Sequence, residues 1–156
     1  MLSHEEIAGR IPHQGTMCLL ERVVAWTPED IRCEAVSHRA AGNPLRAHGR
    51  LGIACGIEYA AQAMAVHGSL VAQSQEGAHG TPRAGYLASV RGVQLHARRL
   101  DDVAGPLLVT ATRLLGDGNH IVYSFEVASQ DATLLTGRAT VVLDAALAAS
   151  IARGNA

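Results

Sequence analysis

The sequence has little net charge and few cysteines. Its formal net charge is −1, and acidic and basic residues are interspersed along the 156 residues. Since no basic stripe is available to neutralise phosphates, nucleic acid is not an expected partner. The three cysteines, Cys18, Cys33 and Cys55, are widely separated and form no CxxC pair. Neither a disulfide framework nor a structural metal site is therefore expected.

The sequence also lacks a long hydrophobic run. No apolar stretch approaches the length of a membrane span, and the start, MLSHEEIAGRIPH, has neither a basic n-region nor an apolar h-region. We therefore expect no membrane partner and a cytoplasmic location. The length fits a single domain over residues 1–156 with its own hydrophobic core.

Local patterns in the first third predict a short helix and a hairpin. Ser3 and Glu6 form a capping box for a helix over residues 4–9, which Gly9 and Pro12 end. Two strands, Met17–Ala25 and Ile31–Ser37, follow, and the turn residues Thr27-Pro28-Glu29-Asp30 lie between them.

The middle and end of the chain predict one long helix and then strands. Residues 52–73 are apolar nearly all round, as expected of a helix enclosed by other structure, and Ser74–Arg83 is typical of a flexible surface loop. Asp117-Gly118-Asn119 marks a tight hairpin, and the tail from Asp144 is expected to form a last helical turn or to fray. The predicted strands are Tyr86–Leu95, Leu107–Leu115, His120–Ser129 and Leu134–Leu143.

This order of elements predicts an α+β fold. An antiparallel sheet of five to seven strands wrapped around one long central helix buries the helix and one face of every strand. That arrangement is the hotdog fold.

Glu58 is the strongest candidate for a functional residue. It is the only ionisable residue in Leu51–Val66, about two turns into the predicted helix, and Gln62 lies one turn further on the same face. Burial of a carboxylate is unfavourable and is expected to raise its pKa, so such a residue marks a possible site. His48 lies on the loop before this helix.

Two segments resemble a known family. Ile11–Val24, IPHQGTMCLLERVV, is similar to the opening of the 3-hydroxyacyl-acyl carrier protein dehydratases, and Gly56–Leu70, GIEYAAQAMAVHGSL, is similar to their central helix. The closest resemblance is to the shorter dehydratase-like branch found with aryl-polyene biosynthesis, in which a Gly-Tyr-Leu strand, here Gly85-Tyr86-Leu87, also recurs.

The resemblance implies a homodimer or a hotdog heterodimer with active sites at the subunit interface, where a histidine of one chain faces a helix carboxylate of the other. It maps the carboxylate to Glu58, the helix amide to Gln62 and the histidine to His48. The loop Ala47–Gly52 departs from the family pattern, since it is shorter and has no proline.

Dehydration would use these residues in distinct roles. His48 would remove the α-proton as the base, and Glu58 would protonate the departing hydroxyl. The backbone N–H of Gly56, with Cys55 beside it, would bind the thioester oxygen, because the first turn of a helix has unpaired donors. The substrate would be carried on acyl carrier protein or coenzyme A, and no metal or organic cofactor would be needed.

Each of these residues also has a purely structural interpretation. Glu58 could pair with Arg50 or Arg91, and His48 could be an ordinary loop histidine.

Three further side chains have simple structural interpretations. His13, although part of the first motif and a candidate substrate contact, is expected to link the N-terminal loop to the sheet. His67 is about half a turn out of phase with Glu58 and is expected to touch solvent or a partner near the helix end. Cys55 is expected to be a small apolar filler.

Arginine supplies the positive charge near the strand that follows the helix. Arg91, Arg98 and Arg99 could meet phosphopantetheine or the acidic surface of a carrier protein, or could form a solvated face.

Dehydration in fatty-acid or polyene biosynthesis is the leading functional hypothesis. The alternatives are a hotdog acyl thioesterase, because His48-Gly49 before a helix carboxylate resembles a thioesterase pattern, and a non-catalytic hotdog subunit of a heterodimeric dehydratase, which the shortened loop favours.

Overall fold

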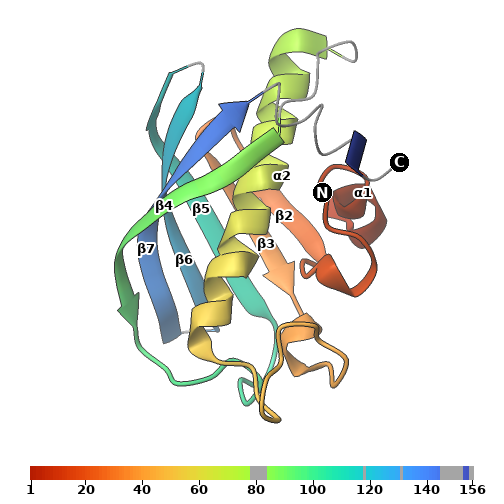
Figure 1. Cartoon of the computed structure of the whole chain (residues 1–156), viewed down its shortest axis with the longest axis vertical. Coiled ribbons are helices and arrows are strands. Elements are labelled where there is room, and N and C mark those ends of the chain that lie inside the picture. Colours follow the sequence, from red (N-terminus) through yellow and green to blue (C-terminus); the bar gives the residue numbers. More distant parts are fainter. Residues whose placement is uncertain (78–83, 118, 131, 145–152, 155–156) are drawn as a thin grey trace.

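The computed structural model describes residues 1–77, 84–117, 119–130, 132–144 and 153–154. A seven-stranded sheet curves around one long helix, which crosses its inner face (Figure 1). The elements in chain order are β1 (Leu2–Ser3), α1 (His4–Ala8), β2 (Arg22–Trp26), β3 (Asp30–Ala35), α2 (Gly56–Glu76), β4 (Ala84–Leu95), β5 (Leu107–Gly116), β6 (His120–Ser129) and β7 (Ala132–Asp144), with short 3-10 turns at Gly15–Met17, Ser37–Arg39 and Ile53–Cys55. The predicted α+β hotdog fold is confirmed.

All strand pairs in the sheet are antiparallel, in the order β1-β2-β3-β5-β6-β7-β4. Helix α2 follows β3 and leads to β4 at the far edge, next to β7. The sheet therefore has β1 at one edge and β4 at the other.

The start of the long helix differs from the prediction. Gly52 has an extended backbone, and Ile53–Cys55 form a 3-10 turn before the α-helix begins at Gly56. Glu58 therefore lies in the first turn of α2, and not two turns into a helix. At the other end, the helix continues to Glu76, so the predicted loop starts later; residues 78–83 lie outside the described part of the chain.

The predicted strand Met17–Ala25 is wrong in its first half, because Met17 ends a 3-10 turn and β2 begins only at Arg22. Most other predicted elements are confirmed with small shifts in their ends. The capping box is present, since Ser3 Oγ accepts from Glu6 N at 3.4 Å and Glu6 Oε2 accepts from Ser3 N at 2.7 Å. Gly118 of the predicted β5–β6 turn and residues 145–152 of the tail lie outside the described residues.

Helix α2 packs closely on the inner face of the sheet. Tyr59, Ala60, Ala63 and Val66 are fully buried, as are alternating residues of the central strands. At its first residue the helix is close to β7, because a Cβ on Gly56 would lie 2.1 Å from Leu135 Cδ2. Glycine at this position lets the start of the helix approach the strand.

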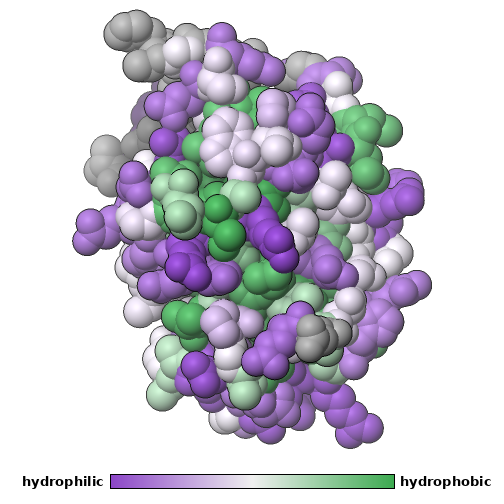
Figure 2. All heavy atoms as spheres, turned by 180° about the vertical axis from the view of Figure 1, so that it is seen from behind, coloured by the Kyte–Doolittle hydropathy of each residue, from purple (hydrophilic) through white to green (hydrophobic). Residues whose placement is uncertain are grey.

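The outer face of the sheet has a different composition. Seen from behind, hydrophilic and hydrophobic residues are interspersed over this side (Figure 2). On β5 and β6 the side chains between the buried positions are mainly polar, namely Thr110, Thr112, Ser124 and Glu126.

Candidate active site

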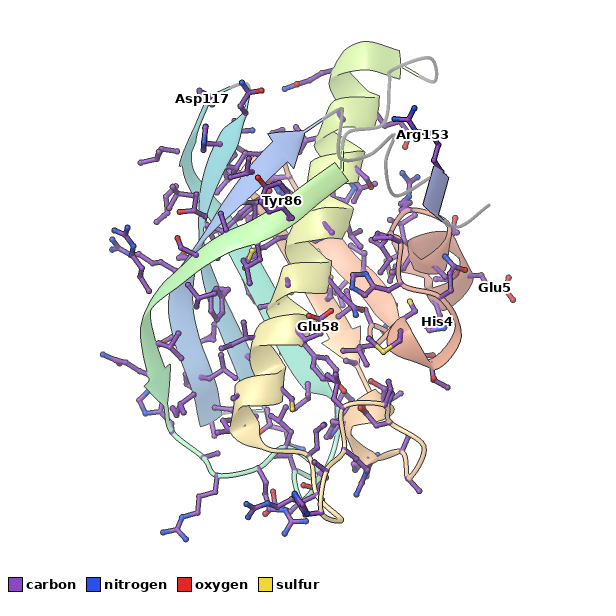
Figure 3. All side chains as sticks on the ribbon, in the orientation of Figure 1. His4, Glu5, Glu58, Tyr86, Asp117 and Arg153 are labelled. Carbon is purple, nitrogen blue, oxygen red and sulfur yellow. The ribbon has the colours of Figure 1, made fainter. Side chains whose placement is uncertain are left out.

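Glu58 lies at the centre of a polar cluster between α2 and the N-terminal segment. Its side chain is 34% exposed, and Oε1 lies 3.0 Å from Nε2 of His13. Gln62, one turn further along α2, donates from Nε2 to the same oxygen at 3.3 Å. Figure 3 shows Glu58 on the side of α2 that faces the N-terminal segment.

Gln62 ties the N-terminal segment to the helix. Its side chain is buried, with Oε1 accepting from Leu19 N at 2.9 Å and Nε2 donating to Met17 O at 2.8 Å. The two segments that carry the family resemblance are therefore in direct contact. A buried amide that is fully bonded in this way fixes one arrangement of the two segments.

The pKa of Glu58 is lowered, contrary to the expectation that burial raises it. The hydrogen bond from His13 is the largest cause, and it acts with the bond from Gln62 against the effect of partial burial. Hydrogen bonds to the ionised form favour that form. Glu58 is therefore a carboxylate at neutral pH.

The structure contradicts both arginine pairings that were considered for Glu58. Among the described residues, the ion-pair partner of Glu58 is His13, and neither Arg50 nor Arg91 pairs with it. His13 was expected to link the N-terminal loop to the sheet; it links that loop to α2 instead. Its Nδ1 is buried and has no hydrogen-bond partner in the described part of the chain.

His48 lies at the tip of a tight turn and is exposed. Ala47 N donates to Arg50 O at 3.0 Å and Arg50 N to Ala47 O at 3.1 Å, with left-handed backbone at His48 (φ 53°) and Gly49 (φ 74°). This is the two-residue turn that tight hairpins prefer. Within one chain, the described contacts of Glu58 do not include His48.

Asp101 holds this turn in place. Its side chain is 6% exposed, and Oδ1 accepts from Leu51 N at 3.1 Å and from Arg99 Nε at 2.8 Å. Arg46 lies 3.6 Å from Oδ2 and donates from Nε to Ala40 O at 2.9 Å. The bond from Arg99 holds the pKa of Asp101 well below its usual range. Arg99, predicted as a possible carrier-protein contact, is therefore engaged inside the chain.

The expected oxyanion donors are already paired. Cys55 N donates to Gly52 O at 3.1 Å, and the N–H of Gly56 bonds carbonyls of the 3-10 turn. The prediction that these N–H groups are unpaired is wrong, because the 3-10 turn supplies acceptors that a bare helix start lacks. Burial raises the pKa of the Cys55 thiol, which agrees with a role in packing.

His67 corrects another prediction, since it is fully buried and does not reach solvent. Nε2 donates to Thr27 O at 2.8 Å, and Nδ1 lies 2.9 Å from the Tyr123 hydroxyl. Burial lowers its pKa, so the imidazole is neutral. The sheet curves over this side of α2, which periodicity within the helix alone does not reveal.

Sequence reasoning missed the polar group around Tyr59. The buried Tyr59 hydroxyl lies 2.8 Å from Ser37 Oγ and 3.1 Å from Asn43 Nδ2, and Ser37 Oγ donates to Leu19 O at 2.8 Å. This group fixes the loop after β3 beside the start of α2. The only signal in the sequence is a tyrosine next to Glu58 in an otherwise apolar helix.

Two classes of feature were not found in the described residues. No group of three or more histidine, cysteine, aspartate or glutamate side chains is arranged to bind a metal ion. In the same part of the chain, none of the helices is long and apolar enough to span a membrane.

Several solved structures are similar to this chain in fold. The chain aligns over 92% of its length with 92% of a chain of the dehydratase heterocomplex ApeI:P from Xenorhabdus doucetiae, with 23% identity and a TM-score of 0.77. A thioesterase from Haemophilus influenzae shares 12% identity with a TM-score of 0.64 and 92% of each chain covered. A thioesterase family protein from Silicibacter pomeroyi shares 12% identity with a TM-score of 0.63, over 90% of this chain and 94% of that one. These likenesses show the hotdog fold.

The search among curated proteins gave no match. The family model described as ApeP-like, ApeP dehydratase, matches residues 5–152, and thus spans both the N-terminal segment and the helix that meet at Glu58. This chain therefore belongs to the ApeP-like dehydratase family.

Proposed function

We propose that this chain is a subunit of a hydro-lyase that removes water from 3-hydroxyacyl thioesters on acyl carrier protein, at a site built around Glu58. The observation that carries the proposal is the convergence of His13 and Gln62 on Glu58 Oε1. It places an oriented carboxylate beside an imidazole where the two family motifs meet. Acyl-chain building on carrier proteins would place the chain in the cytoplasm.

The geometry gives Glu58 a free oxygen for the substrate. Both described contacts use Oε1, while none involves Oε2 among the described residues. The side chain is also one-third exposed, so a ligand can reach it. An oriented carboxylate with one open oxygen is suited to exchange a proton with a bound substrate.

The lowered pKa changes the role that Glu58 takes. An ionised carboxylate must accept a proton before it can donate one. In our proposal, Glu58 Oε2 takes the α-proton, the C–H electron pair forms the new double bond, and the C–O bond breaks. The proton then passes from Glu58 to the departing hydroxyl, which leaves as water. His13 keeps the carboxylate oriented and moderates its basicity.

His48 remains the competing candidate for the base. It is exposed at the tip of a turn that Asp101 and Arg46 hold rigidly, and a side chain presented in this way can enter a site on a neighbouring subunit. In that arrangement, His48 of one subunit takes the α-proton, the C–H electron pair forms the double bond as the C–O bond breaks, and His48 passes the proton to the departing hydroxyl, which leaves as water. Glu58 of the other subunit accepts a hydrogen bond from that hydroxyl and orients it.

A second hotdog subunit is part of the proposal. Strand β4 pairs with β7 on one side only, and Tyr86, Leu87 and Leu95 along it are exposed. Figure 3 shows Tyr86 on β4. A long unpaired edge with apolar side chains is a template for another strand. The similar ApeI:P structure is a heterocomplex, which supports the same kind of assembly for this chain.

The test is to incubate the purified chain, alone and with its co-purified partner, with a 3-hydroxyacyl thioester of acyl carrier protein. Enoyl absorbance without free thiol is expected. Glu58→Gln should reduce the rate by about 100-fold or more, because the amide cannot exchange the proton. Glu5→Gln, the same chemical change at an exposed carboxylate of α1, is the control and should retain activity.

Two results would overturn the proposal. Thiol release without an alkene would identify a thioesterase, the activity of several proteins with the same fold. An unchanged rate in Glu58→Gln would remove Glu58 from the chemistry, and an unchanged rate in His48→Gly as well would leave this chain as a non-catalytic subunit.

A further inference from the structure

Two arginines lie directly opposite each other at the free edge of the sheet. Arg91 on β4 and Arg138 on β7 are Cα partners in the antiparallel pair, and both side chains are exposed. They point to the outer face, since the neighbouring pair is Val90 and Ala139, and Ala139 is buried in the core. Like charges directly opposite on paired strands repel each other.

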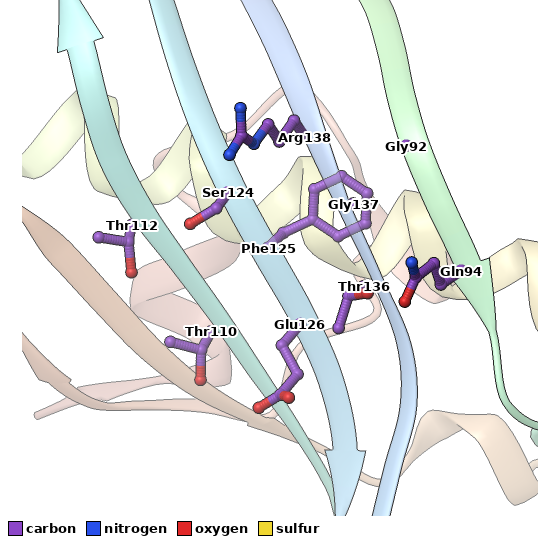
Figure 4. A pocket seen from close by; sticks show the side chains of 10 residues that line it. All are labelled: Gly92, Gln94, Thr110, Thr112, Ser124, Phe125, Glu126, Thr136, Gly137 and Arg138. Carbon is purple, nitrogen blue, oxygen red and sulfur yellow. The ribbon is translucent and has the colours of Figure 1, made fainter.

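No carboxylate in the described part of the chain forms an ion pair with either arginine. The residues that continue the row across β6 and β5 are Ser124 and Thr112, which carry no charge (Figure 4). The next residue in the row is Asp30 on β3, three strands and about 14 Å from Arg138. The nearby Glu126 lies one row away and accepts a hydrogen bond from Thr133 Oγ1 at 2.9 Å. Neither Arg91 nor Arg138 forms an ion pair with a described residue, whereas Arg22 and Arg99 do.

The arginine pair borders the edge that a second subunit would occupy. If two copies of this chain joined through β4 with their outer faces continuous and Val90 opposite its equivalent, Arg91 of each copy would lie opposite Ser89 of the other, and the two Arg91 residues would be two residues out of register. That offset is about 7 Å along the strands and about 5 Å between them. The two Arg91 residues would then lie within about a Debye length of each other, with one Arg138 beside each of them, and Glu126 of each copy would offset only part of this charge.

We propose that Arg91 and Arg138 select the partner: they disfavour a second copy of this chain and favour a hotdog subunit whose edge strand carries aspartate or glutamate on its outward face. The inference rests on the proposed function in one respect, that a hotdog subunit pairs with β4. Repulsion in the wrong pair and attraction in the right pair both contribute to such selection.

Self-association of the full chain tests this proposal. Because the readout is dimerisation and not activity, the result does not depend on whether the proposed dehydration is correct. Sedimentation equilibrium at about 50 mM and about 500 mM salt should show dimerisation of the wild-type chain that strengthens as salt screens the arginines. Arg91→Gln should dimerise about fivefold more tightly than wild type at the lower salt concentration. Arg32→Gln, an exposed arginine on β3 away from this edge, should match wild type.

A charge-reversal mixture tests the attractive part. Arg91→Glu mixed in equal amount with wild-type chain should give mixed dimers clearly above the share of about one half that random pairing gives, measured by native mass spectrometry with one chain isotopically labelled.

Three results would overturn the inference. The first is a tight wild-type homodimer that salt does not affect. The second is an unbiased mixture of wild type and Arg91→Glu. The third is an Arg91→Gln chain that self-associates like wild type but binds acyl carrier protein less tightly, because the arginines would then serve that partner instead.

Discussion

His13 Nε2 and Glu58 Oε1 lie 3.0 Å apart, although one residue is in the N-terminal segment and the other in the first turn of α2. This contact is the largest cause of the lowered pKa of Glu58. It couples the protonation of the proposed catalytic residue to a segment that belongs to neither the helix nor the sheet.

Replacing His13 by alanine should raise the pKa of Glu58. The carboxylate form is lost as the pH falls through this pKa, so the acid limb of the pH–rate profile should move to higher pH in His13→Ala. The direct measurement is a carbon-13 NMR titration of the Glu58 carboxyl group. Gln14→Ala controls for general disturbance of the segment, and an acid limb at the same pH in wild type and His13→Ala would show that the contact does not tune Glu58.

Replacing His48 by glycine separates catalysis from folding. Residue 48 has a φ of 53°, a left-handed conformation that glycine adopts more readily than histidine. The free energy of unfolding of His48→Gly, measured by urea denaturation, should therefore equal that of wild type or exceed it by up to about 1 kcal/mol. If His48 supplies the base, this well-folded variant should lose about 100-fold or more in rate; full activity would leave Glu58 as the base.

Gly56 and Gly68 should respond in opposite directions to alanine. A Cβ at Gly56 meets Leu135 Cδ2 at 2.1 Å, whereas a Cβ at Gly68 meets nothing within 4 Å. We expect Gly56→Ala to lower the free energy of unfolding by about 1–3 kcal/mol through overpacking. Gly68→Ala should raise it by about 0.5–1 kcal/mol, because alanine is the better helix former. Urea denaturation measures both, and equal effects would contradict the close approach of α2 to β7.

The buried histidines should make stability depend on pH below neutrality. Burial lowers the pKa of both His38 and His67, so the unfolded chain binds protons that the folded chain does not. Above about pH 6.5 the histidines are neutral in both states, so they do not reduce the free energy of unfolding. Below that pH the unfolded chain is protonated first, and the free energy of unfolding falls. His38→Gln, which retains a donor for Val103 O, should show a shallower decline in unfolding free energy between about pH 7 and pH 5. Parallel curves for wild type and variant would exclude this contribution.

Much of the fold was predictable because its signals are local. The alternation of Ile121, Tyr123, Phe125 and Val127 predicted β6 at the boundaries His120–Ser129 that the structure shows. The Ser3 and Glu6 capping box is likewise complete within four residues.

The features that sequence reasoning missed depend on contacts between distant residues. The pKa of Glu58 was predicted in the wrong direction because desolvation can be inferred from an apolar sequence, whereas the neighbour that outweighs it lies in another segment. His67 was misplaced for a similar reason, since its partners Thr27 and Tyr123 come from the β2–β3 turn and β6.

The bonds from Gln62 to Met17 and Leu19 have a consequence for how the chain can be shortened. A variant without its first twenty residues would keep the long strands β4–β7. It would lose the segment that covers one side of Glu58, and the Gln62 side chain would lose its hydrogen bonds to Met17 O and Leu19 N. The opening of the chain therefore forms one side of the proposed active site.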